Sequence, residues 1–385
     1  MKDFTLPALG SDMDEARLLE WRVKPGDRVA RGQVVAVVDT SKAAVDVESW
    51  QEGVVFELLA QPGETLAVGA VMATLLEPGE SAQTAKHTER KPAPAVIAAA
   101  APATTPAPVL VAARRRISPA ARKLAQEHGL DLDTLPGTGP DGAVTLQDVQ
   151  HAADTTGAQP PAGDRHAAMR QAIAAAMSRS KREIPHYYLS ETIPLQRAQA
   201  WLSSTNADRD IGSRLLMAVL QLKAVAMALA KYPDLNGFYL DGNHQPCAAV
   251  HIGVAISLRQ GGLIAPAIHD VGQKTLDQLM HDLGDLVRRA RAGSLRSSEM
   301  SDPTITVTNL GDQGVETVYG VIYPPQLALL GFGRVHERAW ASDGALRALP
   351  VVCASLAADH RVSDGHYGAL FLAEVREWLQ RPEQL

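Results

Sequence analysis

The residue that first suggests chemistry in this chain is His360. It follows an apolar stretch at residues 350–355 and precedes Ser363, Asp364 and Gly365. A strand that ends in an Asp/Gly turn can hold an imidazole fixed and partly dry, so that it takes a proton from a substrate. A lone histidine after a strand is more often only a packed turn residue. His360 is therefore a candidate general base that needs support from other residues.

Two further residues could act beside this histidine. Thr308 lies near the end of an alternating stretch at residues 304–309, which predicts a strand that meets a loop at an Asn/Gly turn. A threonine on a strand is ordinarily just a good strand former. Asp364 is placed either to cap a helix that begins at Gly365 or to fix the turn that holds His360.

Together these residues carry a family resemblance. The order Asp359, His360, Arg361 and then Asp364 resembles the active-site signature of the dihydrolipoamide acyltransferase components of 2-oxo acid dehydrogenase complexes. Their catalytic domain, an α/β fold with a mixed sheet, is shared with chloramphenicol acetyltransferase. The resemblance covers residues 165–385, including the strings at 252–257, 262–268 and 323–333, although His251 replaces a common asparagine and His366 a usual small residue.

This resemblance implies thioester acyl transfer. His360 is expected to deprotonate the thiol of CoA or dihydrolipoamide, and the Thr308 hydroxyl to donate to the oxyanion of the tetrahedral intermediate. Asp364 is expected at least to fix the turn around His360. The family forms trimers in which His360 faces Thr308 of a neighbour, and the trimers assemble into larger hollow cores.

The first eighty residues contain an internal repeat at an offset of 37 residues. Gly26 and Gly32 recur as Gly63 and Gly69, each within a Pro-Gly or Gly turn followed by alternating apolar positions. Such a pattern predicts short strands joined by tight turns. Two similar halves indicate a small, flattened all-β barrel or sandwich.

Between the two halves lies a predicted hairpin with Lys42 at its tip. Val45 and Val47 are expected on one face of its second strand. An exposed lysine is usually only a solubilising charge. Residues 4–77, however, resemble a lipoyl domain, in which this lysine carries lipoic acid in amide linkage. Biotin carriers flank the lysine with methionines, whereas Ser41 and Ala43 flank it here; many lipoyl domains have Asp where Ser41 stands.

Two linkers separate the predicted domains. Residues 81–113 are rich in Ala, Pro and Thr, a composition that buries no core and predicts an extended spacer across which a lipoyl domain can travel. A second spacer precedes the catalytic domain. The predicted segments are the lipoyl domain 1–80, the linker 81–113, a binding module 114–153, the linker 154–164 and the catalytic domain 165–385.

The middle module is predicted to be helical. Ser118 is placed as an N-cap of a short helix that ends at Gly129, and a second helix is expected near Thr145. The pair resembles the peripheral-subunit-binding domain, whose positive face docks the thiamine-dependent decarboxylase or dihydrolipoamide dehydrogenase. Arg122 matches the partner-contacting arginine, whereas Ala143 stands where arginine is common.

The composition and charge of the chain bear on what it binds and where it resides. A formal charge of −6 over 385 residues does not indicate a nucleic-acid-binding protein. The N-terminus lacks an apolar signal region, and no apolar run of membrane-spanning length is read from the sequence. The two cysteines, Cys247 and Cys353, predict reduced core thiols and neither a disulfide framework nor a metal site. A cytoplasmic protein without a membrane partner is expected.

No motif in the sequence identifies the acyl group that is transferred. Acetyl is the expectation from frequency within the family, and succinyl, branched-chain or acetoin-derived groups stay open. A different class of function also stays open: a non-catalytic lipoyl carrier that only tethers partner enzymes. His360, Asp364 and Thr308 weigh against it, because a scaffold has no chemical need for them.

Overall fold

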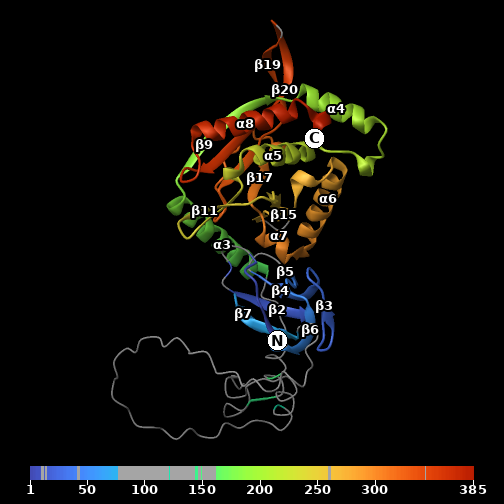
Figure 1. The fold of residues 1–385 in the computed structure, drawn as a ribbon, viewed down its shortest axis with the longest axis vertical. Coiled ribbons are helices and arrows are strands. Elements are labelled where there is room, and N and C mark those ends of the chain that lie inside the picture. Colours follow the sequence, from blue (N-terminus) through green and yellow to red (C-terminus); the bar gives the residue numbers. More distant parts are fainter. Residues whose placement is uncertain are drawn as a thin grey trace, which may run out of the picture. The chain divides into compact units, whose positions relative to one another are not determined.

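The structure is a computed structural model (Figure 1). It describes residues 1–9, 13, 15–40, 44–76, 121, 144–145, 149, 162–258, 262–342 and 344–385. The predictions for Ser41, Lys42, Ala43, Arg122 and Ala143, and for the linker 81–113, therefore lie outside the described residues. Of the two predicted helices of the middle module the structure describes one helical residue each, Ala121 and Val149.

The N-terminal domain is all β. Within its residues the strands form two sheets, one in the order β1-β8-β6-β3 and one in the order β5-β4-β2-β7. The strands are β1 Lys2–Thr5, β2 Glu15–Trp21, β3 Arg28–Val29, β4 Val34–Asp39, β5 Ala44–Glu48, β6 Gly53–Leu58, β7 Thr65–Ala67 and β8 Val71–Leu76. Alternating side chains from both sheets meet in one core, in which Leu18, Val38, Val47 and Met72 are fully buried.

The duplication predicted from sequence is present in the backbone. Strands β4 and β8 lie 37 residues apart at both ends, and β3 and β7 begin 37 residues apart. The turn glycines share the same left-handed conformation, with φ of 95° at Gly26 and 96° at Gly63, and of 80° at Gly32 and 84° at Gly69. These values are costly for any residue with a Cβ, so glycine is required in both halves.

The C-terminal domain is built on a mixed sheet. Its order is β15-β12-β17-β18-β20-β19, with β9 also pairing with β20. Strands β12, β17 and β18 are parallel, and the other pairings are antiparallel. The strands are β9 His186–Pro194, β10 Gly237–Leu240, β11 Asn243–Pro246, β12 Ile252–Val254, β13 Ile256–Ser257, β14 Leu263–Ile264, β15 Ala267–Ile268, β16 Leu295–Arg296, β17 Ile305–Asn309, β18 Ala328–Phe332, β19 His336–Ser342 and β20 Ala345–Asp359.

Helices cover this sheet, and α5 and α8 pack against each other on it (Figure 1). They share one core with the strands, which includes Val225, Val307, Leu356 and Phe371. The α-helices are α3 Ala162–Glu183, α4 Gln196–Ala207, α5 Met217–Lys231, α6 Leu276–Ala292, α7 Ser297–Ser301 and α8 Gly365–Leu379. The 3-10 helices are η3 Ile211–Ser213, η4 Pro233–Leu235, η5 Val271–Gln273, η6 Gly311–Gln313 and η7 Pro382–Gln384.

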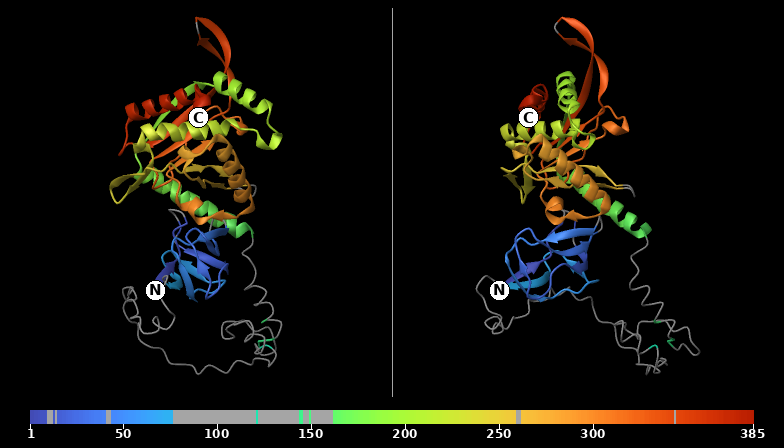
Figure 2. Two further views of the ribbon diagram at one scale, coloured as in Figure 1. Left: turned by 45° about the vertical axis from the view of Figure 1, so that its right-hand side comes forward. Right: turned by 90° about the vertical axis from the view of Figure 1, so that its right-hand side faces the viewer.

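The hairpin formed by β19 and the first half of β20 projects from the domain (Figure 2). Its tip side chains are exposed, and Leu346 is 77% exposed. The second half of β20 continues into the central sheet, where it pairs with β18 and β9 and so anchors the ribbon at its base.

The predicted elements of the catalytic domain are present, with three differences. Helix α3 begins at Ala162, three residues before the expected domain start. The strings at 252–257 and 262–268 form two separate short strand pairs, β12 with β15 and β13 with β14, and Leu263 is exposed. Cys353 is a buried free thiol as expected, but Cys247 is only half-buried.

One helix is apolar and long enough to cross a membrane, contrary to the sequence expectation. It covers residues Ile211–Lys231, and 61% of its apolar window is buried inside the structure. Length and composition alone are weak evidence of a membrane span, because the core helix of a globular domain passes the same test. Here α5 has that position, with ten of its residues buried in the domain core.

Candidate functional site

His360 is the first residue after β20, the longest strand of the sheet. Its backbone N–H donates to the Pro185 carbonyl at 3.0 Å, which ties the turn to the start of β9. Its ring lies edge-on to the Tyr187 ring, with centroids 5.2 Å apart. The histidine is thus held in place, but within one chain it is exposed, so the partly dry setting expected from the sequence is not formed by this chain alone.

Tyr187 is itself anchored. Its hydroxyl lies 2.9 Å from the Ser363 hydroxyl, and Ser363 also donates to the Asp359 carbonyl. Burial raises the pKa of Tyr187 above its ordinary value, so the phenol stays neutral. Gly368 allows this packing, because a Cβ there would lie 2.8 Å from the Tyr187 hydroxyl. No sequence pattern indicates this role for Tyr187, because its partner Ser363 lies 176 positions away.

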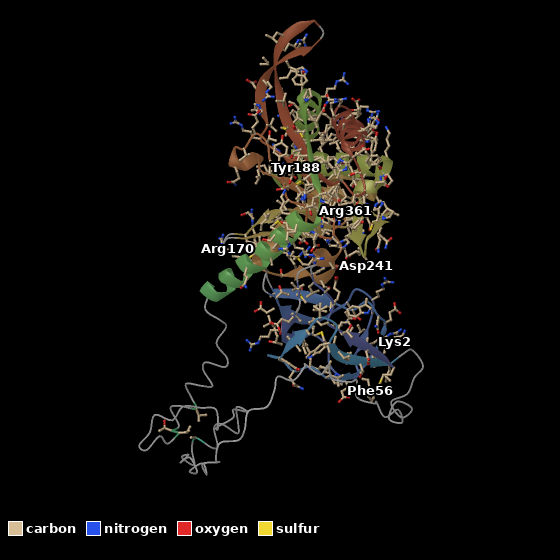
Figure 3. The ribbon with its side chains drawn as sticks, turned by 90° about the vertical axis from the view of Figure 1, so that its left-hand side faces the viewer. Lys2, Phe56, Arg170, Tyr188, Asp241 and Arg361 are labelled. Atoms are coloured by element: carbon tan, nitrogen blue, oxygen red, sulfur yellow. The ribbon has the colours of Figure 1, made fainter. Side chains whose placement is uncertain are left out.

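The turn around His360 is stiffened by an ion pair across it. Asp359 is fully buried and accepts from the Arg361 backbone N–H at 2.9 Å and from its guanidinium at 2.6 and 3.0 Å. Arg361 is labelled in Figure 3. The guanidinium also lies over the Tyr239 ring at 3.8 Å. The hydrogen bond to Asp359 raises the pKa of Arg361 further, so the guanidinium stays charged. A buried carboxylate needs such a partner, which fixes the backbone on both sides of His360.

Asp364 caps helix α8. Its carboxylate accepts from the Tyr367 backbone N–H at 2.9 Å. The hydrogen bond from Tyr367 is the largest cause of a lowered Asp364 pKa, and the charges of His366 and His360 add to it. The carboxylate is therefore anionic at neutral pH, and it links the start of α8 to the turn that carries His360.

Removal of this cap should lower thermal stability in a pH-dependent way. Because the folded-state pKa of Asp364 is lowered, its stabilising effect is present above the usual aspartate pKa of about 4 and is lost as the pH falls through the folded value. Asp364→Ala should therefore melt at a lower temperature than the parent at neutral pH, and the difference should shrink at about pH 3.5. Asp364→Asn, which keeps an acceptor oxygen, should lie between them. Thermal unfolding followed by circular dichroism tests this, and equal melting temperatures at neutral pH would contradict it.

Thr308 lies near the end of β17, just after the last residue that pairs with β12. It is the fourth residue of β17 and half-buried, and it pairs with Gly331 of β18. Within the part of the chain that the structure describes, the Thr308 hydroxyl has no hydrogen-bond partner. The neighbouring Asn309 is tied down instead, because its side chain accepts from the Gly311 N–H at 2.9 Å and donates to Gln221 at 3.0 Å. The hydroxyl is thus a free donor at the end of a fixed strand.

One chain does not bring Thr308 and His360 together. Thr308 is level with Ser355 of β20 through Gly331, and His360 follows Ser355 by five residues. At about 3.3 Å per residue, the two lie about 16 Å apart along the strands, with a further separation across the sheet. No single thioester can touch both. A site that uses both residues must therefore combine two copies of the chain.

The predicted lysine hairpin is bracketed by described residues. Strands β4 and β5 form an antiparallel pair up to Asp39 and Ala44, on either side of residues 41–43, which lie outside the described residues. Val45 and Val47 share one face as predicted and are buried, and Asp46 lies on the other face, where burial raises its pKa.

A cavity lined mostly by residues of the C-terminal domain contains neither of the candidate catalytic residues. It has a volume of about 440 Å³ and is mostly apolar. Its lining includes Ile173 and Met177 of α3, Phe238 of β10, and Tyr323 and Pro325. Neither His360 nor Thr308 lines it, so the assignment of the site rests on the turn after β20 and the end of β17.

Comparison with known proteins gives three family matches along the chain. Residues 162–385 match the 2-oxoacid dehydrogenases acyltransferase catalytic domain, residues 2–75 a model described as biotin-requiring enzyme that covers biotinyl and lipoyl domains, and residues 115–150 an e3 binding domain. These matches confirm the three kinds of domain predicted from the sequence. The exact boundaries between them stay predictions.

Similar proteins include a dihydrolipoyllysine-residue acetyltransferase component of the pyruvate dehydrogenase complex from Rhizobium meliloti. It is 32% identical over 99% of this chain and 98% of its own length. A lipoamide acyltransferase component of the branched-chain alpha-keto acid dehydrogenase complex from Bacillus subtilis is 29% identical over 99% of this chain and 97% of its length.

Solved structures resemble the C-terminal domain. A probable dihydrolipoamide acetyltransferase from Listeria monocytogenes covers 55% of this chain and 92% of its own, with a TM-score of 0.53 and 28% identity. The dihydrolipoamide acetyltransferase of Azotobacter vinelandii gives the same TM-score and identity over 55% of this chain and 88% of its own. They confirm the predicted mixed-sheet fold.

Proposed function

The chain belongs to the 2-oxoacid dehydrogenase acyltransferases, and from this premise we propose that it transfers an acetyl group between the lipoyl arm and CoA, with His360 as general base and Thr308 as oxyanion donor. As a member of the family it is an acyltransferase that carries lipoic acid and uses CoA. We assign the lipoyl attachment to Lys42.

The spacing of the site residues carries this proposal. The Azotobacter vinelandii acetyltransferase structure is described by the role of a serine, a histidine and an asparagine in its catalytic mechanism. There the histidine follows the serine by 52 residues and the asparagine follows the histidine by four. In this chain His360 follows Thr308 by 52 residues and Asp364 follows His360 by four. Threonine keeps the hydroxyl donor of serine, and aspartate keeps the side-chain acceptor of asparagine.

In the proposed mechanism each of these residues has one step. His360, held by Pro185 and Tyr187, takes the proton from the CoA thiol, and the thiolate sulfur bonds to the carbonyl carbon of the acyl thioester. Thr308 donates to the carbonyl oxygen while it carries negative charge. When the carbon–sulfur bond of the departing thiol breaks, His360 returns the proton to that sulfur. A lipoyl group on its lysine supplies the thiol that carries the acyl group.

We propose a homotrimer in which His360 of one subunit meets Thr308 of the next. Support comes from the separation of the two residues within one chain and from the exposure of His360. The projecting β19–β20 ribbon offers contact surface for a second copy. Packing of subunits at the site would exclude water, which strengthens the hydrogen bond from Thr308 to a developing oxyanion. Assembly of trimers into a larger core is part of this proposal.

The acetyl assignment is supported by the Rhizobium relative, while the Bacillus relative acts in a branched-chain complex. Reconstituted complex assayed against pyruvate, 2-oxoglutarate, branched 2-oxo acids and acetoin would decide between them. The highest kcat/KM is expected with pyruvate. A preference for another substrate would overturn the acetyl assignment and leave the acyltransferase itself intact.

Thiol-dependent exchange tests whether the chain is catalytic. Purified chain should transfer acetyl from acetyl-CoA to free dihydrolipoamide without any partner enzyme. A chain that binds its partners but gives no exchange is the tethering scaffold considered above.

The partners follow from the domain types. The match to an e3 binding domain gives the E3 component, dihydrolipoamide dehydrogenase, as a partner. We propose that a thiamine-dependent decarboxylase also docks on this chain. We further propose a cytoplasmic protein that binds neither membrane nor nucleic acid. Its small net charge and the burial of α5 in the domain core support this.

Docking should depend on Arg122. Arg122→Glu reverses a charge on the proposed basic face, so it should weaken binding of at least one dehydrogenase partner, most strongly at low ionic strength. Calorimetric titration of the partner into parent and variant measures this. The matched control Arg22→Glu reverses an exposed charge in the N-terminal domain and should leave the affinity unchanged. Equal affinities of Arg122→Glu and parent at low salt would mean that the module docks through another face.

A further inference from the structure

Helix α5 carries a buried amide whose position calls for an explanation. Its middle is packed in the domain core, and its polar side chains there are Gln221, 2% exposed, and Lys223, 6% exposed. The Lys223 ammonium donates to the Gly272 and Lys274 carbonyls, both at 2.7 Å, and so holds the turn at η5. Burying an amide without a hydrogen bond is unfavourable, and an apolar side chain would pack at least as well. The partner of Gln221 is therefore the reason for the amide.

That partner is Asn309, and the orientation of both amides is settled by the network. The Asn309 side-chain oxygen accepts from the Gly311 N–H at 2.9 Å, so its NH₂ group points the other way. The NH₂ group donates to the Gln221 oxygen at 3.0 Å. The contact joins α5 to the end of β17, which lie beside each other in Figure 1.

The end of β17 lacks the restraint that the rest of the strand has. Strand β12 pairs with β17 only as far as Val307, whereas β18 continues to pair with Thr308 and Asn309. Thr308 and Asn309 are thus held by backbone hydrogen bonds from one side only. The hydrogen bond between Gln221 and Asn309 restrains the residue directly after Thr308, where the pairing with β12 has already ended.

Gln221 cannot act on the Thr308 hydroxyl directly. Successive strand residues point to opposite faces, so Asn309 faces α5 while Thr308 faces the other side of the sheet. Any effect must pass through the backbone between the two residues. An oxyanion donor is effective only when it is held where the charge will develop.

We propose that Gln221 is a positioning residue, which fixes Thr308 at the end of β17 through its hydrogen bond to Asn309. The role rests on the proposed oxyanion function of Thr308. It adds to the site a residue that acts only through another residue and that lies 87 positions before Thr308 in the sequence.

The test compares acetyl transfer from acetyl-CoA to dihydrolipoamide in matched full-length variants. Gln221→Met keeps the length of the side chain and removes its acceptor, and Gln221→Glu keeps an acceptor oxygen. Gln221→Met should lower kcat about tenfold, less than the roughly 10²-fold expected for loss of the donor itself, with the KM for acetyl-CoA nearly unchanged. Gln221→Glu should recover most of the lost kcat.

A control separates positioning from general loss of packing. Thr304→Val removes a buried hydrogen bond from Thr304 to Asn236 just before the other end of β17. It should reduce the melting temperature and leave kcat within about twofold of the parent, since the end that carries Thr308 is untouched. Oligomer size is measured for every variant. A kcat loss in Thr304→Val equal to that in Gln221→Met would overturn the positioning role.

A double-variant cycle with Thr308→Ala completes the test. If Gln221 acts through the Thr308 hydroxyl, Gln221→Met should have no further effect on kcat in the Thr308→Ala background. A loss that persists there in full, or an unchanged kcat in Gln221→Met alone, overturns the positioning role while the function of Thr308 stands. An unchanged kcat in Thr308→Ala overturns the oxyanion assignment itself, and the positioning role with it.

Discussion

Replacement of His360 by alanine is expected to lower acetyl transfer by roughly 10²-fold or more, the scale of losing a positioned base. The effect should fall on kcat, since the thiol proton must leave before the sulfur attacks. The Arg361–Asp359 pair and the Asp364 cap hold the turn without the imidazole, so the variant should fold. Steady-state exchange between acetyl-CoA and dihydrolipoamide measures the loss.

The neighbouring His366 provides the matched control. It is an exposed histidine in the first turn of α8, six residues away, and within the part of the chain that the structure describes it makes no hydrogen bond or ring contact with Tyr187. His366→Ala should therefore retain near-normal transfer. If oligomer size is native and His360→Ala also transfers acetyl groups at nearly the parent rate, the base assignment is wrong and the tethering scaffold becomes the better interpretation.

Local patterns made much of the fold predictable. The 37-residue repeat required the same turns twice, and glycine was needed at φ near 95° at both Gly26 and Gly63. The hairpin up to Asp39 and Ala44 followed from alternation on both sides of a polar tip. The helix cap at Asp364 followed from its place before an apolar helical pattern. In each case neighbours in sequence decide the structure.

The supporting residues of the site could not be found in this way. Tyr187 meets Ser363 across 176 positions, and Asn309 meets Gln221 across 88. The sequence around Gln221 does not distinguish it from a polar residue at the surface of a helix. Only the tertiary structure shows that its side chain is buried. The separation of Thr308 and His360 likewise depends on how β17, β18 and β20 are ordered, which local sequence patterns do not specify.

Replacement of Lys42 by arginine is expected to abolish turnover of the assembled complex with its 2-oxo acid. Arginine keeps the charge at the hairpin tip but cannot form the amide to lipoic acid, so no acyl group can reach the catalytic domain. The catalytic residues are unchanged. The same variant should therefore still transfer acetyl from acetyl-CoA to free dihydrolipoamide at the parent rate.

Lys24 supplies the control for this experiment, because it is an exposed lysine in a turn of the same domain whose backbone, not its ammonium, bonds to Asp27. Lys24→Arg should support full complex turnover. Intact-mass analysis of chain grown with sufficient lipoate should show one lipoyl group in the parent and in Lys24→Arg, and none in Lys42→Arg. Persistence of the lipoyl mass in Lys42→Arg would place the attachment on another lysine. Loss of free dihydrolipoamide transfer would instead mean that the substitution disturbs more than the arm.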